Sequence, residues 1–246
     1  VFATYRKHWE RLDIVQPDTF YIKVCSGCVN RCSYCAVKFS RGYVRSKPIN
    51  KIKKEFLHGI EAGYRKFALI GTDLGSYGKD IQTDLLSLIE ELVSIDEDFK
   101  IRLRNVHPKL LINNISKLLP LVKTKKISHI TTAIQHGNDR ILQLMKRGYL
   151  IKDCISAINA IKKENPKLVI RSQLIVGFPG ETHSDFNDTL NLLNFANVDF
   201  FEIYPFSPRI ATLASKLPNQ ISRTKINRRR YIVIKTYLKQ YNLNTE

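Results

Sequence analysis

The sequence has few of the features that mark secreted and membrane proteins. Only five of its 246 residues are cysteines, and four of them fall between Cys25 and Cys35, whereas a disulfide framework spreads cysteine pairs through a small chain. No apolar run is long enough to cross a bilayer, and there is no signal peptide. We therefore expect a cytoplasmic protein in a reducing compartment, with no membrane partner.

Acidic residues are also scarce. The chain has 22 Asp and Glu against 40 Lys and Arg, which gives a net charge of +18. Residues 38–54 contain seven basic side chains and no acidic one, and residues 221–246 contain seven basic side chains and only Glu246 to oppose them. Such an excess favours a polyanionic partner, most simply nucleic acid, although a solvated basic surface explains it equally well.

The order of apolar segments predicts an α/β fold. A hydrophobic content of 43% is enough for a core, and short β-branched runs alternate with segments of helical periodicity. The expected strands are Thr19–Val24, Lys66–Gly71, Lys100–Val106, Ser128–Ile134, Leu168–Gly177 and Asp199–Pro205. The expected helices are Ile49–Glu61, Asp84–Ser94, Leu111–Val122, Asn138–Lys163 with a break at Gly148, Ser184–Asn197, and a basic amphipathic helix over Thr224–Tyr241. Six such repeats predict a partial (β/α)6 TIM-like barrel of parallel strands with its chemistry at their carboxyl ends, preceded by an irregular lead-in at residues 1–18.

Three clustered cysteines indicate an iron–sulfur site. Cys28, Cys32 and Cys35 follow the first expected strand with the spacing C-x3-C-x2-C, which lets three thiolates turn toward one compact cluster. Three thiolates on a [4Fe–4S] cluster leave one iron free for an outside ligand. A four-cysteine zinc site that includes Cys25 is an alternative, but only three residues separate the two C-x2-C pairs. A closed, ferredoxin-like cluster is another.

The cysteine segment GCVNRCSYC resembles the cluster-binding loop of radical S-adenosylmethionine (SAM) enzymes. Four later segments extend the resemblance to their methylthiotransferase branch: GTDLGSYGKD, IQHGNDRILQLMKRGY, LIVGFPGET and YPFSPRIATLASKLP. The match covers about Phe20 to Arg230 in order. It implies a radical SAM core over residues 19–246, in which a cluster on Cys28, Cys32 and Cys35 cleaves SAM reductively to a 5′-deoxyadenosyl radical.

The resemblance also implies which residues surround SAM. Family members bind the methionine part of SAM at the end of the second strand, and an aromatic residue lies near the adenine. The implied cofactor-binding residues are Tyr34, Gly71, Thr72, Asp73, Gln135, Arg171, Gly177, Phe178 and Gly180. Asp73 is equally well explained as a helix cap, and Gly177 and Gly180 as turn residues. The residues expected to face the substrate are His136, Tyr204, Ser207 and Arg209.

Two cysteines are left without a role in the cluster. Cys25 stands where related sequences usually carry a small residue, so we expect it to be a buried and inert side chain. Cys154 lies in a helical pattern and is expected in the core. Full-length methylthiotransferases carry a second [4Fe–4S] cluster on an N-terminal domain and a small C-terminal β-barrel that binds the substrate. Neither domain is visible here, so we expect this chain to be the catalytic core of a longer enzyme.

The substrate and partners remain expectations at this stage. The basic charge favours methylthiolation of a tRNA adenosine near the anticodon, whereas several motifs are closer to enzymes that modify an aspartate of a small-subunit ribosomal protein. A reductant protein such as flavodoxin or ferredoxin is expected to supply the electron. The competing hypotheses are another radical SAM reaction on peptide or RNA, and a non-enzymatic RNA-binding module with a structural metal.

Overall fold

The chain folds around one sheet of six parallel strands. The computed structural model describes residues 1–11 and 18–240, and its six strands lie in the order β1-β4-β5-β6-β7-β8, with every neighbouring pair parallel. The strands are β1 (Thr19–Lys23), β4 (Lys66–Ile70), β5 (Lys100–Val106), β6 (Ile127–Gln135), β7 (Val169–Val176) and β8 (Phe200–Pro205). Since β1 and β8 are the two edges of this sheet, the barrel is open, which confirms the predicted fold class.

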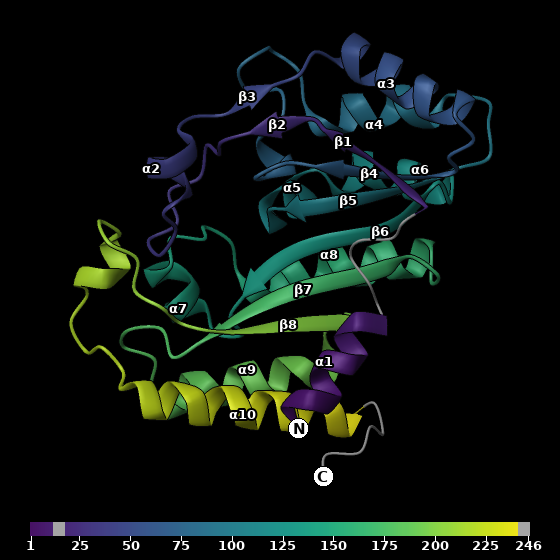
Figure 1. Cartoon of the computed structure of the whole chain (residues 1–246). Coiled ribbons are helices and arrows are strands. Elements are labelled where there is room, and N and C mark those ends of the chain that lie inside the picture. The colour runs from purple at the N-terminus through teal and green to yellow at the C-terminus, as the bar shows by residue number, and fades with distance from the viewer. Residues whose placement is uncertain (12–17, 241–246) are drawn as a thin grey trace.

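Helices connect the strands and cover the outer face of the curved sheet (Figure 1). They are α3 (Ile49–Glu61), α4 (Leu85–Val93), α5 (Pro108–Asn113), α6 (Ile115–Lys123), α7 (Asp139–Leu144), α8 (Ile151–Glu164), α9 (His183–Phe195) and α10 (Arg223–Gln240). Asp84 and Asn138 cap α4 and α7 with their side chains, and Thr182 and Asp185 form a capping box on α9. None of the helices in the described part of the chain is long and apolar enough to span a bilayer.

A core of aliphatic and aromatic side chains lies between the sheet and these helices. Ile52 and Leu69 are fully buried there, and Phe67 lies between the rings of Phe56 and Phe99. The ring centroids of Phe56 and Phe67 are 3.9 Å apart. These contacts hold α3 against β4, and so fix the first strands relative to the loops that follow them.

The amino-terminal segment differs from the expected irregular lead-in. Residues Phe2–Arg11 form α1, which contacts α10, while residues 12–17 lie outside the described part. Tyr5 lies under β8, where its hydroxyl donates to the carbonyl of Phe201 (2.7 Å) and accepts from the amide of Ile203 (2.9 Å). One side chain of α1 thus satisfies two backbone groups on the edge strand β8.

Two further differences concern local breaks. The expected helix Leu111–Val122 is divided into α5 and α6 at Asn114, whose side chain donates to the carbonyl of Leu110. The final helix begins at Arg223, and Tyr241, its expected last residue, lies outside the described residues. The break expected at Gly148 is confirmed, because α7 ends at Leu144 and α8 begins at Ile151.

The segment after β1 forms a separate ribbon. β2 (Cys25–Ser26) pairs antiparallel with β3 (Arg45–Ser46), and the short helix α2 (Val37–Arg41) lies between them. Gly27 has a φ of +77°, and a Cβ there would lie 2.1 Å from the carbonyl oxygen of Tyr43. The ribbon therefore needs glycine at this position, and it closes residues 27–44 into a loop at the carboxyl ends of the strands (Figure 1).

Candidate functional site

The three spaced cysteines lie on one wall of a pocket at the carboxyl ends of the strands. This pocket of about 260 Å³ is lined by Cys28, Cys32 and Cys35, and opposite them by residues that end or follow β4, β5, β6 and β7. Those residues include Thr72, Asp73, Asn105, His107, Gln135 and Gln173. The parallel topology thus gathers residues from five segments of the chain around the thiols, as the sequence predicted.

The pocket has a second opening on the side of α2. The same three cysteines line a hollow of about 300 Å³ together with Lys38, Phe39 and residues 211–213. The Phe39 side chain is 67% exposed and that of Leu213 is 53% exposed. An apolar rim with basic neighbours therefore borders the thiols where the loop faces solvent.

Asp73 is the hydrogen-bonding centre of the pocket wall. Its carboxylate accepts from Asn30 Nδ2 (2.7 Å), Ser76 Oγ (2.6 Å) and the thiol of Cys28 (3.5 Å). It also accepts from the amide of Gly75, which caps the 3₁₀ turn η1 (Leu74–Ser76). Asp73 therefore is the cap that the sequence suggested, and it lines the pocket as well.

The thiols lie in a partly buried environment. Burial, with the charge of Asp73, raises the pKa of Cys28, and burial raises the pKa of Cys35. Cys32 Sγ accepts from Arg147 Nη1 at 3.2 Å. Within residues 1–11 and 18–240, no three His, Cys, Asp or Glu side chains are close enough to hold one metal ion in this conformation. Cluster binding therefore requires the thiols to exchange their present contacts for iron.

The cysteine loop is held in place from behind by Ser33. Its backbone amide donates to the carbonyl of Met145 (3.0 Å), its hydroxyl donates to the carbonyl of Leu144 (2.7 Å), and its own carbonyl accepts from the amide of Ala214 (2.8 Å). Ser33 is only 3% exposed. The end of α7 and the start of η2 (Leu213–Lys216) thus grip the loop between Cys32 and Cys35.

The donor set fits a sulfur-ligated cluster beside a polar cofactor. The three thiols belong to one loop with iron–sulfur spacing and line the same pocket. Two buried polar atoms of the opposite wall, Gln135 Oε1 and His107 Nε2, have no hydrogen-bond partner within the described residues. Buried polar atoms usually have partners, so these two are suited to a polar ligand in the pocket.

The other two cysteines lie apart from this pocket. Cys25 is 3% exposed, its thiol donates to the carbonyl of Asp73 at 3.5 Å, and burial together with the charge of Asp73 raises its pKa to about 12. A Cβ on Gly71 would lie 2.6 Å from Cys25 Sγ, so this glycine makes room for the thiol. Cys154 is buried in the core, and burial raises its pKa to about 12. Neither thiol lines the cysteine pocket.

The glycine-rich segment after β7 shapes the site indirectly. Gly177 has a φ of +80°, and a Cβ there would lie 2.4 Å from Ile226 Cγ1 of α10. Phe178 is fully buried in a small cluster with Met145 and Phe206, against which Tyr34 packs. Of the implied cofactor residues, Tyr34 lines the pocket whereas Gly177, Phe178 and Gly180 do not. Their implied direct contact with a cofactor is wrong for this conformation, because they support Tyr34 and α10 from behind.

His136 does not reach the pocket. Its side chain has no exposed surface and lies against Thr189 and Glu181, with Nε2 3.5 Å from Glu181 Oε1. The prediction that it faces a substrate is wrong for this reason. Glu181 also pairs with Arg229 of α10 (3.0 Å) and accepts from the amide of Gly177, so the three charged or titratable groups join β6, α9 and α10.

Arg171 is engaged inside the sheet. Its guanidinium lies 3.2 Å from Glu202 on β8 and over the ring of Phe200. Gln173 donates to the same carboxylate (3.1 Å), so the two residues share a face of β7 as predicted, but only Gln173 lines the pocket. Tyr204 also donates to Glu202 and is 46% exposed. Ser207 and Arg209 are exposed on the segment after β8.

Sequence reasoning missed two residues of the site, Arg147 and His107. Arg147 lies within a quoted segment, but nothing in that segment shows that it reaches Cys32, which is 115 positions away. His107 Nδ1 accepts from the amide of Lys109 and caps α5, so the signal for it was a histidine directly before proline at a strand end. Burial, with Arg147 and Lys109, lowers its pKa to about 2.

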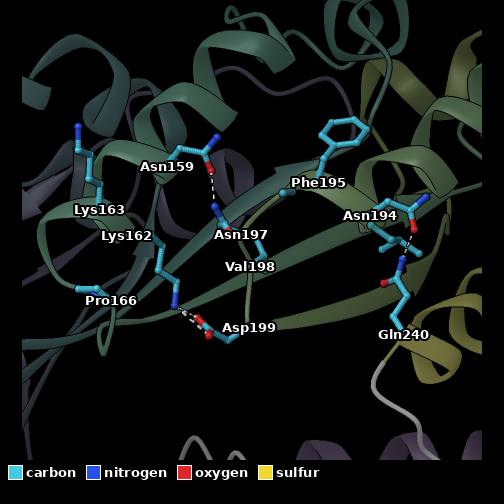
Figure 2. A pocket seen from close by; sticks show the side chains of 12 residues that line it. Asn159, Lys162, Lys163, Pro166, Asn194, Phe195, Asn197, Val198, Asp199 and Gln240 are labelled. Carbon is cyan, nitrogen blue, oxygen red and sulfur yellow. Dashed lines mark hydrogen bonds and ion pairs between the residues drawn. The ribbon is translucent and has the colours of Figure 1, made fainter.

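A larger hollow of about 810 Å³ lies at the other end of the sheet, between the ends of α8 and α9 (Figure 2). Its polar side chains are occupied with each other: Lys162 pairs with Asp199 (2.7 Å), and Asn197 donates to Asn159 (2.8 Å). The chemistry-bearing residues therefore gather in the smaller pocket beside the cysteines.

Comparison with known proteins matches this geometry. A sequence model described as the Radical SAM superfamily matches residues 22–193. The threonylcarbamoyladenosine tRNA methylthiotransferase MtaB of Thermotoga maritima is 34% identical over 206 residues, which are 83% of this chain and 47% of that protein. The ribosomal protein uS12 methylthiotransferase RimO of Chlamydia pneumoniae is 34% identical over 82% of this chain and 44% of its own length. A tRNA-2-methylthio-N(6)-dimethylallyladenosine synthase of Thermodesulfovibrio yellowstonii is 36% identical over 82% of this chain and 46% of its own length.

Solved structures share the fold at low identity. The radical SAM enzyme coproporphyrinogen III oxidase of Escherichia coli superposes with a TM-score of 0.61 and 14% identity, covering 90% of this chain and 52% of that one. The methyltransferase TsrM of Kitasatospora setae gives a TM-score of 0.63 with 12% identity, over 76% of this chain and 36% of that one. The chain spans about half the length of the curated relatives it matches.

Proposed function

Because this chain belongs to the radical SAM superfamily, we propose that it is the catalytic core of a methylthiotransferase that modifies tRNA. The observation that carries the proposal is one pocket with three thiols of iron–sulfur spacing on one wall and unpartnered polar atoms on the other. The relatives named as methylthiotransferases support the reaction class.

In this proposal Cys28, Cys32 and Cys35 hold a [4Fe–4S] cluster, and the open iron coordinates SAM. When bound, the cluster and SAM supply reductive cleavage of the sulfonium C–S bond. The protein binds and orients SAM through polar groups of the opposite wall, foremost Gln135 and Gln173, and Tyr34 covers one side of the pocket. Asp73 fixes the cysteine loop through Asn30 and limits its movement.

Sulfur insertion needs more than these residues provide. A second three-cysteine cluster has no ligands among the 246 residues once three thiols hold the first, because only Cys25 and Cys154 remain and both are buried. We therefore assign SAM cleavage, and not sulfur insertion, to this chain.

A tRNA substrate is favoured by the surface beside the pocket. Lys38, Arg41 and Arg45 are exposed on α2 and the ribbon that follows it, next to the exposed ring of Phe39. Basic side chains with an exposed aromatic ring suit a phosphate backbone and an unstacked base. Such a substrate is consistent with a cytoplasmic location. A ribosomal-protein substrate is the second candidate, because the relative named RimO is as similar to this chain as the one named MtaB.

Anaerobic reconstitution with iron and sulfide tests the proposed chemistry. We expect a brown protein that forms 5′-deoxyadenosine from SAM when dithionite or reduced flavodoxin supplies electrons. Cys32→Ala should abolish cluster binding and cleavage, whereas Cys25→Ser, the matched control in a buried thiol outside the pocket, should keep both. A colourless zinc-loaded protein, or loss of the cluster in Cys25→Ser, would contradict the assignment.

A further inference from the structure

Arg147 is a buried cation directly beside the cysteine loop. It lies between α7 and α8 and is only 4% exposed. Its guanidinium donates to Cys32 Sγ at 3.2 Å, to the hydroxyl of Tyr34 at 3.3 Å and to the carbonyl of Ala133 at 2.6 Å. Its Nε–H points to the hydroxyl of Tyr149 at 3.4 Å. The guanidinium is thus fixed by β6 on one side and faces a thiol on the other.

This arginine differs from the other buried arginines in what compensates its charge. Arg171 pairs with Glu202 (3.2 Å), and Arg229 pairs with Glu181 (3.0 Å). Within the described residues, Arg147 forms no ion pair with a carboxylate, and its acceptors are a sulfur, two phenol oxygens and a carbonyl. A buried charge without an opposite charge is strongly unfavourable, so the site calls for an anion next to Arg147.

The anion within its reach is the Cys32 sulfur in its metal-bound, thiolate form. A cubane held by three thiolates is anionic as a whole, and its reduction adds a further negative charge. Reduction potentials of iron–sulfur clusters depend on the net charge nearby and on hydrogen bonds to the sulfurs. A buried cation that donates N–H to one of these sulfurs favours the reduced form over the oxidised form.

The backbone keeps this arrangement rigid. The end of α7 that leads to Arg147 is the same segment whose carbonyls, at Leu144 and Met145, hold Ser33 beside Cys32. The guanidinium and the sulfur are therefore positioned by one brace, and neither depends on a long exposed side chain.

We propose that Arg147 is the positioning counterion of the cluster: it holds Cys32 and raises the reduction potential at which the cluster accepts an electron. This inference rests on the proposed cluster function. Arg147→Met keeps most of the apolar length and removes the charge, Arg147→Lys keeps a charge, and Lys146→Met removes one charge from the exposed neighbouring residue as the matched control.

The test measures iron and sulfide content and the midpoint potential by EPR-monitored redox titration of the reconstituted full chain. We expect Arg147→Met to shift the midpoint to more negative potential or to lose iron, while Arg147→Lys stays closer to the wild type and Lys146→Met is unchanged. An Arg147→Met protein with wild-type iron content and midpoint, or an Arg147→Lys protein as impaired as Arg147→Met, would overturn the inference. Failure of the wild-type chain to bind a cluster would instead refute the proposed function.

Discussion

At the scale of single residues, the pocket uses histidine as a neutral group. His107 is 8% exposed, its Nδ1 accepts from the amide of Lys109 to cap α5, and its Nε2 has no partner among the described residues. Burial first, then the nearby charges of Arg147 and Lys109, lower its pKa from 6.5 to about 2. The imidazole therefore stays uncharged in the folded protein at any pH at which the protein is handled.

A consequence for stability follows at acidic pH. The unfolded chain takes up a proton on His107 as the pH falls below about 6.5, but the folded chain does not, so folding stability is lost from that pH downward. Between pH 7.5 and 5.0 this histidine alone accounts for at most about 2 kcal/mol. His107→Asn keeps a capping side chain and removes the titration, so urea unfolding should show a smaller loss of stability over this range. Equal acid losses in the wild type and the variant would contradict the neutral assignment.

At the scale of elements, the last helix is tied to the site by a buried ion pair. Arg229 of α10 donates to the carbonyls of Glu181 and Thr182 and pairs with the Glu181 carboxylate, which in turn accepts from the amide of Gly177. Arg230 donates to the carbonyl of Ile203 on β8. Part of the positive charge that made this helix a candidate for RNA binding therefore serves the fold.

Breaking this pair should be costly. Glu181→Gln leaves the buried Arg229 without its counterion, and we expect a loss of about 3 kcal/mol in the free energy of unfolding. Glu91→Gln is the control, because it breaks the exposed pair with Lys53 and should cost less than about 1 kcal/mol. Urea denaturation measures both. If Glu181→Gln with Arg229→Met is no more stable than the sum of the two single losses predicts, the groups are not coupled.

The elements also show how far the sequence carries. The six strands lie within one or two residues of their predicted ranges, because β-branched apolar runs bounded by polar loops are a local signal. The division at Asn114 and the β2–β3 ribbon were missed because they depend on single hydrogen bonds and on a two-residue pairing. The burial of His136 and the contact of Arg147 with Cys32 depend on partners far away in the chain, which no local pattern reveals.

At the scale of the whole molecule, charge and chemistry meet at one end. The thiols, the exposed basic residues of α2 and the exposed rings beside them all lie at the carboxyl ends of the strands, whereas the hollow of Figure 2 lies at the amino ends and has its charges paired. The net charge of +18 is thus placed in part where a long anionic substrate would approach the pocket.

Binding to tRNA should therefore weaken steeply with salt. We expect the association constant to fall at least tenfold between 50 and 200 mM salt in a fluorescence-anisotropy titration, because phosphate contacts release counterions. Replacing Lys38 and Arg41 with Gln should make the salt dependence shallower by about one logarithmic unit of slope per lost contact. The matched pair Lys123→Gln and Lys125→Gln, exposed before β6, should leave the slope unchanged. A flat salt response, or equal effects of both pairs, would show that the surface near α2 is incidental.

The hydroxyl of Tyr5 has one further consequence, for the behaviour of shortened chains. It occupies two backbone groups at the outer border of β8, and without it this border would offer free amides and carbonyls to another molecule. Trimming the first few residues would remove no ligand of the pocket, yet it would leave a sticky strand ready for self-association. Poor solubility of a trimmed chain would then reflect this uncovered border and not a damaged iron site.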